Sequence, residues 1–288
     1  DDTAAALEAI QVLGVKVRKS QNATDGLDLK IESQGAPFNC STKDLYTGDS
    51  GITTRFVLPM LGLRANFDQP VLYNCGLQMQ QRPLQPLINA LNSLGMKISS
   101  PRGAAFPLLV SGPLAGGKII LDGLTSQYLS ALLISLPLAR ENSEITVPNL
   151  HERPYVEMTT YWLDQQGIAY QWLAQNGADI FTITGGQSYH PFTQTIPGDF
   201  SSASYLLAAA AFFPGEVTIT GLDFKDPQGD KRIVAILQAM GAAIEISPEK
   251  LIIRGGQPLR GLEIDCKEIP DLLPTLAVLG TYASGVTS

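Results

Sequence analysis

The chain has 288 residues, of which 44% are hydrophobic and 16% charged, so it can bury large cores in two domains and is too apolar to be disordered. Its net charge of −7 argues against a nucleic-acid surface, which needs a basic face, but a few local arginines can still bind a small anion. Three widely spaced cysteines and two histidines predict neither a disulfide framework nor a metal site, and they fit a reducing compartment.

A pattern of a helix, a glycine and a strand recurs along the chain, in Leu7–Val17, Leu87–Ile98, Thr159–Tyr170 and Val234–Ile246. In each copy a glycine follows the last apolar turn of the helix, where a left-handed backbone is expected: Gly14, Gly95, Gly167 and Gly241. These glycines lie farther apart than the roughly 20–50 residues of a solenoid repeat. We therefore expect several copies of a small α/β unit, with a site where copies face each other.

Further elements follow in the same order in each copy. A second strand ends at a glycine, in Leu29–Gly35, Leu108–Gly112, Phe181–Gly186 and Leu251–Gly256. A helix with a polar start then leads into an apolar run, and these starts are Gly48–Arg55, Leu124–Tyr128, Gly198–Tyr205 and Ile269–Leu273. The unit reads strand–helix–strand–helix–strand–strand, and one helix of each unit is apolar enough to be buried in its domain. Ser188–Pro197, rich in Ser, Thr and Pro, predicts a domain change.

The polar helix starts are candidate anion sites, because the free N–H groups of a helix N-terminus favour phosphate or carboxylate. For any single start, ordinary capping by Ser, Thr or Asp is the better interpretation. Here the starts repeat and lie near Arg55, Arg82 and Arg153 in the sequence, which favours a shared anionic ligand.

Short motifs occur at these places, in Gly48–Arg55, Met79–Pro83, Thr125–Leu133, Arg153–Glu157, Gly198–Tyr205, Gln228–Asp230 and Ile269–Asp271. In this order, and over essentially the whole chain, they resemble the 5-enolpyruvylshikimate-3-phosphate (EPSP) synthase family of enolpyruvyl transferases. The resemblance implies an α/β fold, a two-domain inverse α/β barrel built from repeated βαβαββ units and incomplete in this chain. Residues 1–196 would form one domain of three units, the first incomplete. Residues 197–288 would hold one full unit and the start of another.

The resemblance also implies a reaction, the transfer of the enolpyruvyl group of phosphoenolpyruvate to the 5-hydroxyl of shikimate 3-phosphate with release of phosphate. The reaction belongs to aromatic amino acid (chorismate) biosynthesis, and it uses no metal and no organic cofactor. We expect a cytoplasmic monomer whose partners are the two small anionic substrates. Neither nucleic acid nor membrane is expected, since the longest strongly apolar stretch, Tyr205–Phe213, is too short to cross a bilayer.

Gly51, Arg82 and Gln127 match the family residues that bind phosphoenolpyruvate. At Gly51 the absence of a side chain would let the backbone approach the substrate, although a plain turn glycine fits the same pattern. A planar guanidinium at Arg82 suits a phosphate or carboxylate, whereas a surface salt bridge is the alternative. Arg55 either joins this site or holds its loop together.

A second set of residues matches those that bind shikimate 3-phosphate: Thr125, Ser126, Gln127, Arg153, Tyr155 and Asp271. Among them Asp271 matches the catalytic proton acceptor, with an N-cap aspartate as the alternative. Asp199 and Asp49 are interpreted as helix caps. Glu152 replaces the usual serine, and because a carboxylate repels phosphate, no substrate role is assigned to it. Ile52 replaces the usual threonine beside Gly51, from which we expect a lower sensitivity to glyphosate.

Two alternatives remain open. UDP-N-acetylglucosamine enolpyruvyl transferase shares the fold but uses a loop cysteine as general acid, and the spacing from Cys75 to Arg82 does not match it. The chain is therefore expected to bury Cys75 as an ordinary thiol. The other alternative is a catalytically silent binding module, because counterparts of the family's N-terminal Lys-Ser…Arg segment and C-terminal Asn, Lys and Arg residues are not found. We expect a chain truncated at both ends.

Overall fold

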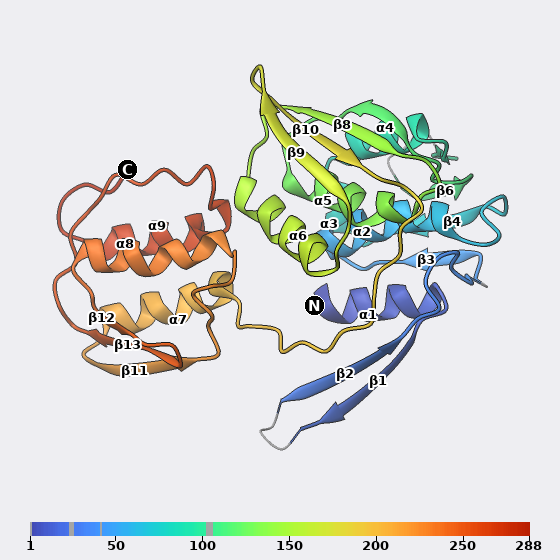
Figure 1. The fold of residues 1–288 in the computed structure, drawn as a ribbon. Coiled ribbons are helices and arrows are strands. Elements are labelled where there is room, and N and C mark those ends of the chain that lie inside the picture. Colours follow the sequence, from blue (N-terminus) through green and yellow to red (C-terminus); the bar gives the residue numbers. More distant parts are fainter. Residues whose placement is uncertain (1, 23–25, 41, 102–105) are drawn as a thin grey trace. The chain divides into compact units, whose positions relative to one another are not determined.

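The computed structural model describes residues 2–22, 26–40, 42–101 and 106–288 (Figure 1). The chain divides into two compact units. Unit 1 comprises Asp1–Leu150 and Trp162–His190, and unit 2 comprises His151–Tyr161 and Pro191–Ser288. The domain boundary expected between residues 196 and 197 stays a prediction. Among the described residues, no helix has the length and apolar character needed to cross a membrane.

Two copies of one strand–helix–strand–helix–strand–strand motif lie in unit 1, except that residues 153–161, which begin the second helix of the second copy, belong to unit 2. The first copy is β3 (Asp44–Tyr46), α2 (Gly51–Met60) with η1 (Leu61–Leu63), β4 (Val71–Asn74), α3 (Leu77–Gln80), α4 (Gln85–Ser93), β5 (Lys97–Ser99) and β6 (Leu108–Ser111). The second is β7 (Gly117–Ile120), α5 (Ser126–Ser135) with η2 (Leu136–Leu138), β8 (Ser143–Pro148), α6 (Arg153–Gln165), β9 (Tyr170–Gln175) and β10 (Ala178–Ile183).

The two copies share one sheet topology. Their strand orders are β3-β4-β6-β5 and β7-β8-β10-β9. In each, the first two strands pair in parallel, which requires the crossover helix between them, and the remaining pairs are antiparallel. The α/β class predicted from the repeat is therefore confirmed. Ahead of these copies lie α1 (Asp2–Val12) and the antiparallel pair β1 (Lys16–Gln21) and β2 (Leu27–Glu32).

The junction glycines have the predicted backbone. Gly14, Gly95, Gly167 and Gly241 have φ values of +87°, +101°, +65° and +111°, all in the left-handed region. Each ends its helix and turns the chain into the next strand at a conformation that costs glycine little.

Unit 2 repeats the motif with one strand fewer. It contains α7 (Phe200–Phe212), β11 (Gly215–Thr220), η3 (Gly229–Lys231), α8 (Arg232–Met240), β12 (Ala243–Ile246), β13 (Lys250–Gly255), η4 (Pro270–Leu272) and α9 (Leu273–Tyr282). Its sheet has the order β11-β13-β12, and residues 191–199, all described, form no strand ahead of α7. This differs from the full unit expected here. Pro191 and Pro197 lack the N–H that a ladder needs, and residues 191–196 bury no side chain.

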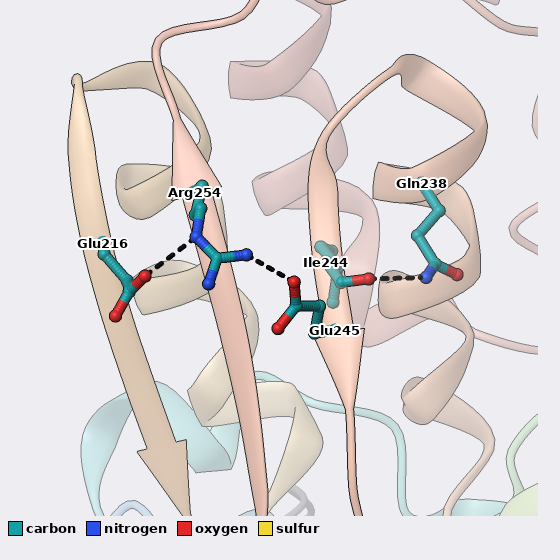
Figure 2. A network of polar contacts seen from close by, with 5 residues as sticks. All are labelled: Glu216, Gln238, Ile244, Glu245 and Arg254. Atoms are coloured by element: carbon teal, nitrogen blue, oxygen red, sulfur yellow. Dashed lines mark hydrogen bonds and ion pairs between the residues drawn. The ribbon is translucent and has the colours of Figure 1, made fainter.

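The two faces of the unit 2 sheet differ. Helices α7, α8 and α9 lie on one face (Figure 1) and enclose the core, into which Leu251 and Ile253 of β13 point. Arg254 of β13 donates to Glu216 of β11 at 2.8 Å and to Glu245 of β12 at 2.6 Å (Figure 2). Gln238 of α8 donates to the carbonyl of Ile244 in β12. These partly exposed ion pairs link all three strands at the solvent side.

The predicted buried helices are buried to different degrees. In unit 1, α2 and α5 pack against each other, and all of α5 except Gln127 and Ile134 is buried. In unit 2, α9 buries only Thr275, Leu276 and Leu279, and larger apolar side chains of α9, such as Leu273 and Tyr282, are exposed. The expectation of a buried helix therefore holds best for α5, is met in part by α2, which exposes Ile52, and fails for α9.

Candidate functional site

The start of α2 is held firmly in unit 1. The Ser50 hydroxyl accepts the Thr53 N–H at 3.2 Å and so caps the helix. Thr54 donates its hydroxyl to the Ser50 carbonyl at 2.7 Å, and the buried Tyr73 hydroxyl donates to the Thr54 carbonyl at 2.6 Å. The first N–H groups of α2 therefore have a defined direction.

Two guanidinium groups and an amide meet at this helix start. A Cβ built on Gly51 would lie 3.0 Å from Arg55 Nη1, 3.1 Å from Arg82 Nη1 and 3.8 Å from Gln127 Oε1. Gly51 is buried and does not have a positive φ, so the need for glycine is the close approach of these groups. The predicted residues Gly51, Arg82 and Gln127 are thus brought together, with Arg55 beside them.

Arg55 joins the three segments of this cluster. Its side chain is buried, and Nη1 donates to Gln127 Oε1 at 2.6 Å. Its guanidinium lies over the Tyr128 ring, 5.6 Å from the ring centre, and the Tyr128 hydroxyl donates to the Pro83 carbonyl at 2.6 Å. These contacts agree with the loop-holding interpretation of Arg55. Arg82, one residue before Pro83, is exposed and so can meet a solute.

The start of α5 combines capping with the predicted site. Thr125 is the N-cap, and its hydroxyl accepts the Gln127 N–H at 3.4 Å. Ser126 is buried behind it. Asp49 also caps a helix, but the helix is α3 rather than the adjacent α2: its carboxylate accepts the Gln78 and Met79 N–H groups at 3.2 and 3.3 Å.

Unit 2 gathers carboxylates where unit 1 gathers guanidinium groups. Tyr155, in the first turn of α6, donates its hydroxyl to both oxygens of Asp230, at 3.3 and 3.2 Å. Asp230 is 1% exposed and also accepts the Ser201 hydroxyl from the first turn of α7. Asp199 caps α7 by accepting the Ser201 and Ser202 N–H groups at 2.9 and 3.0 Å, as predicted.

Asp271, the predicted proton acceptor, lies in η4 of the same unit. The residue as a whole is exposed, yet partial desolvation of its carboxyl raises the pKa of Asp271 above the usual range. A hydrogen bond from Tyr155 lowers that pKa, and the charges of Glu152 and Asp199 raise it. Burial likewise raises the pKa of Asp230, and burial beside these carboxylates raises the pKa of Tyr155. The carboxylates of this cluster therefore bind a proton more readily than solvated ones, and the Tyr155 phenol stays protonated.

Helix α6 begins at Arg153, and Glu152 directly precedes it. The Arg153 N–H donates to Glu268 at 2.9 Å, so a distant carboxylate caps this helix. Glu152 has a φ of +55°, which is uncommon for a residue with a side chain. Glu268 and Asp230 were not identified as site residues from the sequence. The motif Gln228–Asp230 was the available signal for Asp230, and nothing in the local pattern marks Glu268.

The thiol of Cys75 is unsuited to nucleophilic chemistry. It follows β4 and is 1% exposed, and burial raises the pKa of Cys75 to about 12. The interpretation of Cys75 as an ordinary buried thiol is confirmed. Within the described residues, no group of three or more His, Cys, Asp or Glu is arranged to hold a metal ion.

The chain is similar to known proteins that carry one family description. A family model described as EPSP synthase (3-phosphoshikimate 1-carboxyvinyltransferase) matches residues 1–288. A relative from Acetivibrio thermocellus, named 3-phosphoshikimate 1-carboxyvinyltransferase, is 39% identical over 288 residues, which is 100% of this chain and 65% of the relative. One of the same name from Methanothrix thermoacetophila is 43% identical over 290 residues, 99% of this chain and 65% of the relative. The chain thus spans about two thirds of these proteins.

Solved structures share the fold. EPSP synthase from Acinetobacter baumannii matches with a TM-score of 0.73 at 21% identity, over 98% of this chain and 63% of that one. The enolpyruvyl transferase NikO from Streptomyces tendae matches with a TM-score of 0.71 at 17% identity, over 98% of this chain and 65% of that one. The family model, which matches all 288 residues, shows that the chain belongs to the EPSP synthase family.

Proposed function

We propose that this chain carries most of the substrate-binding and proton-accepting residues of a 3-phosphoshikimate 1-carboxyvinyltransferase. The observation that supports this most strongly is the meeting of Gly51, Arg82 and Gln127 at the start of α2, together with Arg55. A helix N-terminus with two guanidinium groups is suited to a small phosphorylated carboxylate such as phosphoenolpyruvate. Arg82 is its exposed guanidinium, and the missing side chain of Gly51 lets both guanidinium groups approach the start of the helix.

Shikimate 3-phosphate is the proposed second substrate. Thr125, Ser126 and Gln127 at the start of α5 are assigned to it, together with Arg153 and Tyr155 at the start of α6. The hydroxyl and N–H groups of these helix starts are suited to a phosphate and a sugar-like ring. No metal and no organic cofactor are needed for these contacts.

Asp271 is the proposed proton acceptor. It takes the proton of the 5-hydroxyl while that oxygen bonds to C2 of phosphoenolpyruvate and C3 gains a proton. Loss of a proton from C3 then restores the double bond as the bond from C2 to the phosphate oxygen breaks and phosphate is released. The raised pKa of Asp271 makes it a better base than a fully solvated carboxylate. A cytoplasmic, monomeric enzyme without nucleic-acid or membrane partners completes the proposal, and sedimentation of the purified chain tests the oligomeric state.

The decisive experiment is an assay of phosphate release. It uses this chain, and a chimaera in which the chain is joined to the segments of the Acetivibrio thermocellus relative that lie outside the aligned region. We expect turnover with phosphoenolpyruvate and shikimate 3-phosphate in the chimaera. Turnover with UDP-N-acetylglucosamine instead would favour the sister reaction, and substrate binding without turnover in either form would favour a silent module.

The residue after Gly51 is expected to affect inhibition by glyphosate, which competes for the phosphoenolpyruvate position. Ile52 is 40% exposed beside the guanidinium cluster, where a branched apolar side chain replaces a hydroxyl. We expect Ile52→Thr to increase inhibition by glyphosate in the form that turns over, with phosphoenolpyruvate kinetics as the reference. Identical inhibition curves for the two proteins would contradict this expectation.

A further inference from the structure

The segment Gln228–Asp230 has a structural role that the proposed reaction does not use. Gln228 accepts the Phe200 N–H at 2.8 Å and donates to the Gly198 carbonyl at 3.1 Å, so it holds the start of α7. A Cβ on Gly229 would lie 2.6 Å from Pro154 Cβ, so this glycine packs closely on the start of α6. The segment therefore joins the first turns of α6 and α7 within unit 2.

Asp230 makes this junction with a buried carboxylate. It accepts the Tyr155 hydroxyl from α6 and the Ser201 hydroxyl from α7, and it is 1% exposed. Desolvating a carboxylate is costly, and apolar side chains would join two helices without that cost. What a carboxylate offers in addition is a charge and a strong acceptor for the phenol.

Tyr155 connects this carboxylate to the proposed base. Its hydroxyl lies 3.2 Å from Asp230, and it is also close enough to Asp271 to lower the pKa of that carboxyl by hydrogen bonding. A phenol has one proton, so the two carboxylates compete for it. While the Tyr155 hydroxyl donates its hydrogen bond to Asp230, the oxygens of Asp271 are left to take a proton from the substrate.

The surroundings of Asp271 are strongly acidic. Its neighbours are Tyr155 of α6 and Glu152 directly before that helix, Asp199 at the start of α7, and Asp230 of η3 through Tyr155. Arg153 and Glu268 lie at the same helix start, joined through the Arg153 N–H. Negative charge beside a carboxylate disfavours its ionised form and so strengthens it as a base.

We propose that Asp230 is a positioning residue for the reaction assigned above: it accepts the hydrogen bonds of the Tyr155 and Ser201 hydroxyls, orients both groups, and so leaves the oxygens of Asp271 available to substrate. The inference rests on the proposed function of Asp271. It assigns a role to a residue that touches neither substrate in this scheme. Substituting Asp230 should therefore alter catalysis through Tyr155 and Asp271 rather than through lost substrate contacts.

Asp230→Asn tests this with little change in volume. A neutral amide is a weaker acceptor than a carboxylate, so the Tyr155 hydroxyl donates to Asp271 instead. The pKa of Asp271 then falls, because it gains this hydrogen bond and because the negative charge at residue 230 is gone. We expect kcat to fall about tenfold and the acidic limb of the kcat/KM profile to move about half a pH unit lower. The KM for shikimate 3-phosphate should change less than kcat.

Tyr155→Phe and the double variant show whether the effect passes through the phenol. In the Tyr155→Phe background, Asp230→Asn should cost clearly less in kcat than it does alone, because the shared proton is gone. Glu249→Gln, which removes an exposed carboxylate from the turn between β12 and β13, is the matched control and should leave kcat and the pH profile unchanged. Thermal unfolding of every variant separates lost activity from lost fold.

Several results would overturn the proposal. An unmoved acidic limb with Asp230→Asn, or equal costs of that change with and without the phenol, would reduce Asp230 to a structural link. If Asp230→Asn does not fold, Asp230→Ser and Asp230→Glu are measured in the same way. Absence of turnover in the parent protein would instead count against the proposed function. In that case non-additive shifts in Tm between Asp230→Asn and Tyr155→Phe still report their coupling.

Discussion

Unit 1 and unit 2 both bring helix N-termini together, but the side chains gathered there are positively charged in unit 1 and negatively charged in unit 2. In both, helix starts from neighbouring repeats meet, α2 with α5 in unit 1 and α6 with α7 and η4 in unit 2. The unit 1 starts collect Arg55 and Arg82, whereas the unit 2 starts collect Asp199, Asp230 and Asp271. Each helix start presents N–H groups, so the backbone alone favours anions in both places.

The comparison teaches that the repeat decides where polar groups gather and the side chains decide the chemistry. In unit 1 the guanidinium groups add to the positive field of the helix start, which suits the proposed anion site. In unit 2 burial and, to a smaller extent, the charges of neighbouring carboxylates raise the pKa values of Asp230 and Asp271. One cluster is therefore suited to holding a charged ligand, and the other to accepting a proton.

The strongest test removes the proposed base from the acidic cluster. Asp271→Ala should lower kcat by roughly 10²–10⁴-fold, with a much smaller effect on substrate binding, since general base catalysis is lost while the binding groups remain. Steady-state kinetics on the form that turns over check this. A near-normal kcat would show that the base has been assigned to the wrong residue.

The next test removes a cation from unit 1. Arg82→Ala should raise the KM for phosphoenolpyruvate by about 10–100-fold, the value of a charge-assisted hydrogen bond or two, while kcat changes less. Arg140→Ala, which removes an exposed arginine of the same unit, is the matched control. If both variants raise the KM for phosphoenolpyruvate equally, net charge rather than the helix-start cluster determines binding.

A smaller effect is expected at equivalent glycines of the two units. Gly241→Ala in unit 2 should cost about 1–2 kcal/mol of unfolding free energy, because the left-handed backbone is strained while the nearest atom lies at 3.4 Å. Gly14→Ala in unit 1 should cost more, because its Cβ would meet the Asn39 carbonyl at 2.7 Å. Denaturant unfolding of both variants ranks them, and equal losses would mean that only backbone strain matters.

The smallest effect concerns stability and pH in the acidic cluster. The folded-state pKa of Asp271 is raised, so its contribution to stability is fully present below the unfolded pKa and is lost as pH rises through the folded value. Asp271→Asn should therefore raise Tm slightly near pH 7, and the gain should disappear below about pH 4. A Tm that falls at pH 7 would show that the carboxylate stabilises the fold.

The sequence by itself determined the repeat and the local features of each copy. The junction glycines, the Asp199 cap and the polar starts of α2, α5 and α7 follow from periodicity and short-range capping chemistry, which act over a few residues. The α/β class follows because each repeat places helices between paired strands.

Only the tertiary structure decided which helix starts meet and which charges share a site. Arg55 reaches Gln127 across 72 positions, and Arg153 finds Glu268 across 115. The missing first strand of unit 2, the exposed side of α9 and the burial of Asp230 are likewise tertiary outcomes. Hydrophobic period and capping residues carry information about one element at a time, whereas these contacts depend on how several elements pack together.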